Sequence, residues 1–446
     1  MRSTEYEWQR LDTVAMIFPP ASTVTVPNVF RVSCRLYEEI DPQTLQTAVE
    51  KALDELPYFK CRIRRGFFWY YMEGNPRPPI IREESVYPCR KMDKNITNGY
   101  LFSVIYFGRY IHLEAFHALT DATGARILLM KIVKHYLLTK HPQDVKTEDF
   151  ITDDMPSGKA QSEDSFQRIT SYKKDSGKSI FSKRAYTASN TLTQNGEVRV
   201  LKGIMSVAQL KAAAKKYRVT ISQYMTAALI YSFYLESFRY EPVNKAISVN
   251  IPVNLRSFFD SSTLRNFFIN FAVSVNFYKH DYSFEDVVDI TAASFSDEID
   301  AEKLLKRVHY NVKFQKNKVI RFVPLFIKSV VLKVIFGRSE SNFTTLFSNI
   351  GVTAMPECAE KYVERFEFMT APTLRSRYKT TAASYLDTLV FCFATTVDNT
   401  DIQRCFFKLL RDDGVDVTIS TNSGAEEYGR AEKPAEESGG EAAEKA

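Results

Sequence analysis

The sequence has few cysteines and no long apolar run. Its 446 residues include 6 Cys, which lie far apart and form no C-x-x-C pair. This spacing argues against a zinc ribbon, a redox motif or a disulfide framework, and we expect no metal site. No stretch approaches the roughly 20 apolar residues of a membrane span, and the first residues contain no apolar signal-peptide core. We therefore expect a cytoplasmic protein without a transmembrane segment.

Glycine and proline are also scarce, with 16 Gly and 17 Pro, while 45% of the residues are hydrophobic. This composition is that of a globular protein, and the length allows two lobes with separate cores. The net charge is +6 although the end of the chain, from Glu426 onward, is acidic. The mildly basic body suits an anionic co-substrate such as a nucleotide-bearing thioester. It has no Arg-rich helix and no RNA-binding aromatic signature, so we expect no nucleic acid.

Strand and helix patterns alternate in both halves of the chain. Asp41 as N-cap and Pro42 at the first position predict a helix that ends before Pro57. Another helix is predicted over roughly 124–138, and a charged one near 284–308. The predicted strands are 28–36, 59–63, 67–72, 100–107, 110–116, 198–205, 246–251, 271–277, 363–368, 386–396 and 415–421. Mixed elements throughout indicate an α/β or α+β architecture.

Composition divides the chain into four parts. We expect an N-terminal lobe over 1–142 and a C-terminal lobe over 196–422. The polar, weakly periodic residues 143–195 between them are interpreted as a crossover linker, partly disordered. Residues 423–446 are rich in Gly, Ala and Glu and are expected to form a disordered acidic tail.

The segment from His112 to Gly124 is the most informative for chemistry. An apolar strand delivers His117 to its end, and a short polar turn containing Asp121 leads into a helix. An imidazole at a strand–helix junction is held rigidly where a substrate can reach it. The spacing alone leaves a second interpretation open, in which His117 merely ends a strand and Asp121 caps the next helix.

This segment resembles the HHxxxDG motif of the chloramphenicol-acetyltransferase-like superfamily, which includes condensation domains, plant BAHD transferases and alcohol-acetyltransferase-like proteins. The resemblance covers roughly residues 8–421, and the alcohol-acetyltransferase-like branch is the most similar. It implies two lobes, each a mixed sheet with helices, and an active-site tunnel between them. Beyond the motif it rests on the segments 10–12, 17–19, 41–63, 252–256, 264–268, 347–352 and 355–357.

Two positions depart from the motif: Phe116 replaces the first His, and Ala122 replaces the Gly. The plant DFGWG motif is absent, which argues against that branch. The family's base is the second His, which His117 matches. A neutral imidazole can accept a proton from a hydroxyl or amine.

The resemblance also implies roles for other residues. Asp121 would be structural and pair with an Arg, for which Arg256 is the candidate; an ordinary surface position for Arg256 is the alternative. Ser348 and Asn349 are candidates for stabilising the oxyanion, unless they only end a strand. Asn266 is a further candidate for the channel.

The implied function is transfer of an acyl or acetyl group from acyl-CoA to a small-molecule alcohol or lipid, with no bound cofactor. A thioester on a carrier protein is the alternative donor. A non-catalytic binding protein that keeps the fold is a second alternative, which Phe116 and Ala122 leave open. Residues 318–336 mix Lys and Arg with large apolar residues. They could touch a membrane surface peripherally or line an acceptor pocket, but we expect a buried helix between domains.

Overall fold

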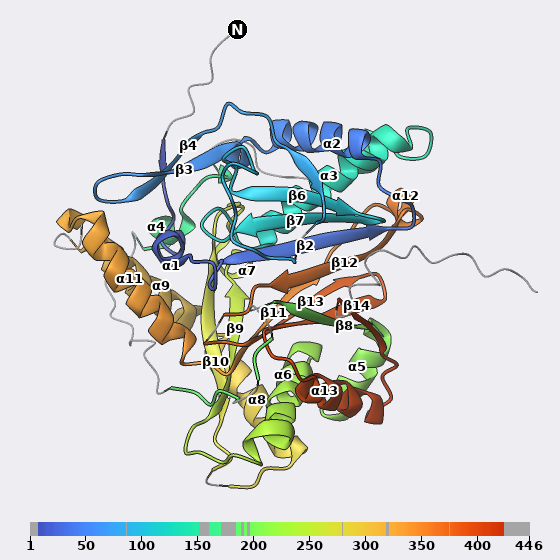
Figure 1. Ribbon diagram of the computed structural model, residues 1–446. Coiled ribbons are helices and arrows are strands. Elements are labelled where there is room, and N and C mark those ends of the chain that lie inside the picture. Colours follow the sequence, from blue (N-terminus) through green and yellow to red (C-terminus); the bar gives the residue numbers. More distant parts are fainter. Residues whose placement is uncertain are drawn as a thin grey trace, which may run out of the picture.

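The protein consists of two lobes, each built on its own sheet (Figure 1). The computed structural model describes residues 8–85, 87–150, 160–170, 184–188, 191–193, 197–278, 280–317, 321–373 and 375–422. The predicted tail over 423–446 and much of the predicted linker lie outside the described residues. The mixed α/β architecture predicted from the sequence is confirmed.

The N-terminal lobe contains a five-stranded sheet in the order β12-β2-β7-β6-β5. Two long helices, α2 and α3, cover the face of this sheet that points away from the second lobe (Figure 1). Asp41 caps α2 as predicted, because its side chain accepts the Thr44 backbone N–H. The elements are β2 (Val29–Leu36), β5 (Ile81–Glu83), β6 (Phe102–Phe107), β7 (Tyr110–Phe116), β12 (Val363–Thr370), α2 (Pro42–Glu55) and α3 (Ala122–Lys140).

A small three-stranded sheet, in the order β1-β4-β3, lies beside this lobe and ends in the β3–β4 hairpin. Its strands are β1 (Gln9–Arg10), β3 (Cys61–Arg65) and β4 (Tyr70–Gly74). A short helix, α1 (Phe18–Ala21), follows β1 and carries an aromatic residue toward the space between the lobes.

The C-terminal lobe contains a seven-stranded sheet in the order β10-β9-β11-β13-β14-β8-β15. Strand β11 runs parallel to both of its neighbours, and the other pairings are antiparallel. The strands are β8 (Arg199–Ser206), β9 (Ile247–Asn254), β10 (Phe268–Val275), β11 (Thr345–Val352), β13 (Tyr378–Tyr385), β14 (Thr388–Thr395) and β15 (Thr418–Thr421).

Helices cover the far face of this second sheet (Figure 1). They are α5 (Val207–Lys216), α6 (Ile221–Phe233), α8 (Phe284–Glu298) and α13 (Asp401–Asp412), and α6 continues into the π-helix η6 (Tyr234–Phe238). A capping box formed by Thr220 and Gln223 opens α6. The charged segment predicted as one helix near 284–308 is two helices, α8 and α9 (Ala301–Lys316).

Strand β12 ties the lobes together. It lies within the range predicted for the C-terminal lobe, yet it pairs antiparallel with β2 at the edge of the first lobe's sheet. On the same strand, the buried Glu367 Oε2 lies 2.6 Å from Lys202 Nζ of β8. Strand β12, which crosses to the first lobe, and this ion pair connect the two sheets.

The prediction of a buried helix over 318–336 was wrong. Residues 318–320 lie outside the described part, and the helix α11 (Leu325–Glu340) exposes Phe326, Val330 and Val334 to solvent. Its inner face contacts α1, and among the described residues no second layer covers its outer face (Figure 1).

The lobes are in direct contact at the start of α3. Thr120 Oγ1 donates a hydrogen bond of 2.5 Å to the carbonyl oxygen of Leu264 in the second lobe. A Cβ on Gly124 would lie 2.4 Å from the same oxygen, so only glycine fits there. Ala122, which occupies the motif's usual Gly position, is the first residue of α3 and has no positive φ. The junction therefore needs its glycine at 124 and accommodates alanine at 122.

Replacing Gly124 with alanine should lower the free energy of unfolding by about 1–3 kcal/mol, because the added methyl must displace backbone atoms. Urea unfolding measures this difference. Thr123→Ala, in the same turn but lining the cavity, is the control and should change stability much less. Equal stability of Gly124→Ala and the unmodified protein would contradict the close approach.

Candidate active site

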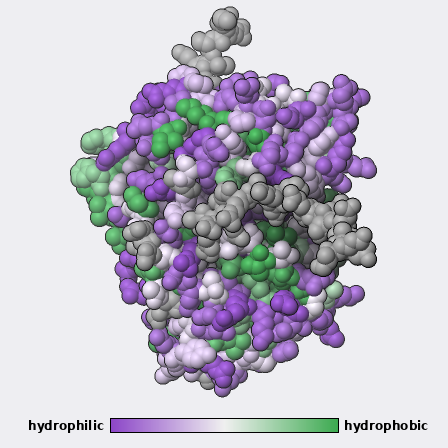
Figure 2. All heavy atoms as spheres, turned by 45° about the vertical axis from the view of Figure 1, so that its right-hand side comes forward, coloured by the Kyte–Doolittle hydropathy of each residue, from purple (hydrophilic) through white to green (hydrophobic). Residues whose placement is uncertain are grey.

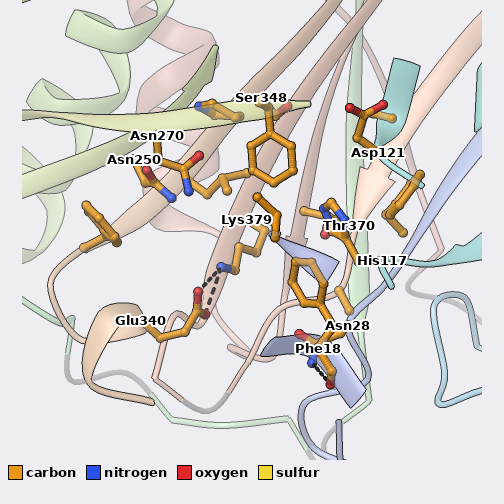
Figure 3. Close-up of a pocket in the computed structure, with 18 of the residues that line it drawn as sticks. Phe18, Asn28, His117, Asp121, Asn250, Asn270, Glu340, Ser348, Thr370 and Lys379 are labelled. Carbon is orange, nitrogen blue, oxygen red and sulfur yellow. Dashed lines mark hydrogen bonds and ion pairs between the residues drawn. The ribbon is translucent and has the colours of Figure 1, made fainter. Parts of the chain in front are cut away.

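A cavity of about 310 Å³ lies between the lobes (Figure 3). The first lobe contributes the end of β7, α1 and the start of α3 to its lining. The second lobe contributes β9, β10, β11 and β13, and the C-terminal end of α11 closes one side. His117, Asp121, Ser348 and Asn349 line this cavity, so the structure brings these four predicted site residues into one place.

His117 directly follows β7 and is held from several sides. Its backbone N–H donates to the Asn28 carbonyl oxygen at 2.9 Å. The Phe18 ring stacks on the imidazole with ring centroids 4.5 Å apart, and the Phe30 ring meets it edge-on at 5.0 Å. Because aromatic rings on two sides limit its rotation, the imidazole has one well-defined orientation.

The neighbours of His117 also fix its tautomer. Asn266 Nδ2 donates to the His117 carbonyl oxygen and to Asp12 Oδ2, both at 3.0 Å. Its Oδ1 must therefore accept, and His117 Nδ1, 2.9 Å away, must carry the proton. His117 Nε2 makes no hydrogen bond within the described part of the chain. Its lone pair is free to accept a proton from a molecule in the cavity.

Burial lowers the pKa of His117 below 6.5, because desolvation disfavours the imidazolium. The nearby Asp121 carboxylate and the hydrogen bond with Asn266 act in the opposite direction. The imidazole is therefore neutral at neutral pH, the form that a general base requires.

Asp121 is buried and saturated with hydrogen bonds. Its Oδ1 accepts from the Gly124 backbone N–H at 3.0 Å, and its Oδ2 accepts from the Phe267 backbone N–H at 2.9 Å. Arg256 Nη1 and Nη2 lie 2.8 and 3.1 Å from the two oxygens. Asp121 and Arg256 thus form a bidentate ion pair between the two lobes. A carboxylate with four donors has little capacity left to act on a substrate.

The two oxyanion candidates differ in their hydrogen bonds. Both Ser348 and Asn349 of β11 border the cavity. The Asn349 side chain is engaged elsewhere: its Nδ2 donates to Ser222 Oγ of α6 at 3.2 Å, and its Oδ1 accepts the Gly351 N–H. Ser348 Oγ has no hydrogen bond within the described residues, whereas the Asn349 amide is held by both of its contacts, so Ser348 is the better candidate.

The cavity has an aromatic end around His117 and a polar end on the second lobe's sheet (Figure 3). At the polar end Lys379 Nζ pairs with Glu340 Oε2 at 3.0 Å. Asn250 on β9 and Asn270 on β10 lie nearby, and each presents a buried Oδ1 that has no partner in the described part of the chain. An unsatisfied buried amide is costly to a fold, so a pair of them facing one cavity indicates a place for a polar ligand.

Sequence reasoning missed the polar end and the role of Asp12. Asn250 lies within the strand predicted over 246–251 from its apolar residues. A polar residue at an inward-facing position of such a strand is the signal that could have identified Asn250 as a site residue. Asp12 is buried, and burial raises its pKa, while Asn266 and the Ala15 backbone N–H donate to it. In the sequence, Asp12 stands out only as a member of the segment 10–12, on which the family resemblance partly rests.

Replacing Arg256 with methionine should lower the free energy of unfolding by about 3 kcal/mol, because the Asp121 carboxylate would stay buried without a counter-charge. Thermal or urea unfolding is the measurement. Lys306→Met removes an exposed ion pair with Glu302 and should cost less than about 1 kcal/mol. Similar losses of unfolding free energy in the two variants would show that the ion pair between Arg256 and Asp121 does not stabilise the fold.

No family model matches the sequence, and no curated protein sequence matches it. Solved structures do resemble it. The structure of TRI101 from F. graminearum, complexed with coenzyme A and T-2 mycotoxin, aligns with a TM-score of 0.58 and 12% identity, over 89% of this chain and 96% of that one. The TRI3 trichothecene 15-O-acetyltransferase from Fusarium sporotrichioides gives a TM-score of 0.56 and 11% identity, over 93% and 98%.

The epimerization domain from the third module of tyrocidine synthetase B is also similar, with a TM-score of 0.53 and 10% identity over 92% of this chain and 97% of that one. Identities this low bear on the fold alone. Together they confirm the prediction made from the sequence motifs: the chain has the two-lobed fold of the chloramphenicol-acetyltransferase-like superfamily.

Proposed function

We propose that this protein is an acyltransferase that moves an acyl group from a coenzyme A thioester to the hydroxyl of an acceptor, with His117 as general base. The observation that carries the proposal is the free Nε2 of a neutral imidazole in a cavity lined by both lobes. Proteins of the same fold include one named as an O-acetyltransferase and one solved with coenzyme A, which supports this choice of reaction and donor.

The acceptor hydroxyl would donate its proton to His117 Nε2 while its oxygen attacks the thioester carbonyl carbon. The resulting imidazolium is stabilised because Asn266 Oδ1 already accepts the Nδ1 proton. The Ser348 hydroxyl, on the cavity side of β11, would donate to the oxyanion of the tetrahedral intermediate. When the intermediate collapses, the C–S bond breaks, and the thiolate takes the proton back from Nε2. No covalent acyl-enzyme is needed.

The polar end of the cavity supports an acceptor that carries a second hydrogen-bonding group. Asn250 and Asn270 each offer an amide that can both donate and accept, as a neutral hydroxyl requires. Lys379 is neutralised by Glu340, so this end has no unbalanced charge for a carboxylate or phosphate. We therefore propose a neutral acceptor with at least two hydroxyl or amide groups.

His117→Ala should lower the rate of thiol release from acetyl-CoA, measured with a panel of diols and amino alcohols, by about 10²–10⁴-fold. The unmodified enzyme should gain activity as the pH rises through an apparent pKa below 6.5, because only the neutral imidazole accepts a proton, and should reach a plateau near neutral pH.

His280→Ala is the control, since His280 is exposed and lies outside the cavity. A parallel assay supplies the acyl group on a carrier-protein thioester. Activity with the carrier-protein thioester alone would show that the acyl donor is the carrier protein and not coenzyme A. Thiol release that is the same in His117→Ala and the unmodified protein, with either donor, would overturn the enzymatic function.

Asn250→Leu should weaken catalysis and leave the fold intact or more stable. It removes a buried amide whose Oδ1 has no partner, so the free energy of unfolding should stay the same or rise by about 1 kcal/mol. The same change should lower kcat/KM for a hydroxylated acceptor roughly tenfold. Asn276→Leu, which removes an amide outside the cavity, should leave kcat/KM unchanged. Undiminished kcat/KM in Asn250→Leu would rule out the polar end as the acceptor's binding place.

A further inference from the structure

Helix α11 exposes a continuous apolar stripe. Large side chains recur every fourth residue on its outer side, so they share one face of the helix. Phe326 is 60% exposed and Val330 65% exposed, and Phe322, just before the helix, is 75% exposed. We name as the α11 face the residues Phe322, Phe326, Ile327, Val330, Val331 and Val334, all of them exposed.

The β3–β4 hairpin extends this surface. Its tip carries Phe67, 70% exposed, and Phe68, whose ring meets the Phe322 ring edge-on at 6.4 Å. The Leu325 backbone N–H donates to the Phe67 carbonyl oxygen at 2.8 Å, which fixes the hairpin tip against the start of α11. Figure 2 shows hydrophobic side chains gathered at the left edge of the molecule, the side on which α11 lies in Figure 1. The two elements form one apolar surface.

Helix α11 differs from an ordinary surface helix because it buries a cation and exposes large apolar side chains. Its charged Lys328 is buried: Nζ donates to the carbonyl oxygens of Phe68 and Arg321 and lies 3.4 Å from the centre of the Trp69 ring. Meanwhile phenylalanine and valine face water. A helix stabilised only by its own protein would place these residues the other way round.

The charges around the stripe are of one sign. Arg321, Lys333 and Arg338 are exposed, and no acidic residue occurs between 321 and 339. Arg65 is exposed beside the hairpin tip. Apolar side chains ringed by cations match the surface of an anionic bilayer, whose hydrocarbon accepts the former and whose headgroups attract the latter. A second protein surface of the same chain would bring these cations against each other.

We propose that the α11 face and the hairpin tip dock on the surface of an anionic lipid bilayer. No helix in the described part of the chain is long and apolar enough to cross a membrane, so the contact is peripheral. The opposite side of α11 lines the cavity through Phe336, Ser339 and Glu340. Docking would therefore place the cavity next to the lipid, within reach of an acceptor dissolved in it.

Co-sedimentation with phosphatidylcholine vesicles, with and without phosphatidylserine, tests this proposal. The protein should bind the anionic vesicles, and binding should fall as salt is added. Phe326→Asp combined with Val330→Asp should lower the partition coefficient at least about tenfold, and Lys333→Gln about fivefold. Tyr240→Asp, at a side chain 75% exposed in the turn after η6, is the matched control and should bind as the unmodified protein does.

Circular dichroism of each variant checks that the fold is kept, which the exposure of the replaced side chains favours. Two results would overturn the proposal. One is equal sedimentation with and without vesicles. The other is a dimer, seen by analytical ultracentrifugation, that the double variant dissociates while vesicles bind neither form; this result would assign the face to a second copy of the chain. Co-sedimentation and ultracentrifugation do not depend on acyl transfer. A failure of the proposed reaction would therefore leave both results unchanged.

Discussion

The Asp121 carboxylate sets the geometry on which the rest of the site depends. A buried charge is costly unless donors surround it, and the donors here come from both lobes: the first turn of α3 in one, and Arg256 and the Phe267 N–H in the other. The lobes must therefore meet at this point. His117 lies four residues before the carboxylate, and the Phe268 ring, one residue after its donor, lies 5.5 Å from the imidazole. The shape of the cavity follows from one ion pair.

The polar groups of the site are of two kinds: those that are hydrogen-bonded within the protein hold the site in place, and those without a protein partner are available to a ligand. Asp12, Asp121 and Asn266 use their hydrogen-bonding capacity on neighbouring protein groups, and their effect is to hold the imidazole and the lobe junction. Within the described residues, His117 Nε2 and the Oδ1 atoms of Asn250 and Asn270 have no hydrogen-bond partner. Because these three groups border one cavity, they support the proposal that a polar ligand binds there.

Local signals were readable in the sequence, and long-range ones were not. The capping pattern at Asp41 and the strand–turn–helix around His117 depend on neighbouring residues, and the resemblance supplied the fold that joins them. By contrast, β12 has the pattern of any strand, and nothing in it shows that it pairs with β2 rather than within its own lobe. The preference for Ser348 over Asn349 depends on the hydrogen bond between the Asn349 amide and Ser222 of α6. A contact between segments this far apart in the chain is not visible in a local pattern.

The orientation of α11 shows why a pattern alone misplaces a helix. Apolar residues occur on several of its sides, so periodicity does not identify the buried face. The structure buries Lys328 because two carbonyl oxygens and the Trp69 ring replace its water. Burial lowers the pKa of Lys328 to about 8, so the amine still carries its proton at neutral pH and keeps these contacts. With the inner positions filled in this way, phenylalanine and valine remain outside, where folding gains nothing from them. Their exposure is the observation on which the proposed docking to a lipid surface rests.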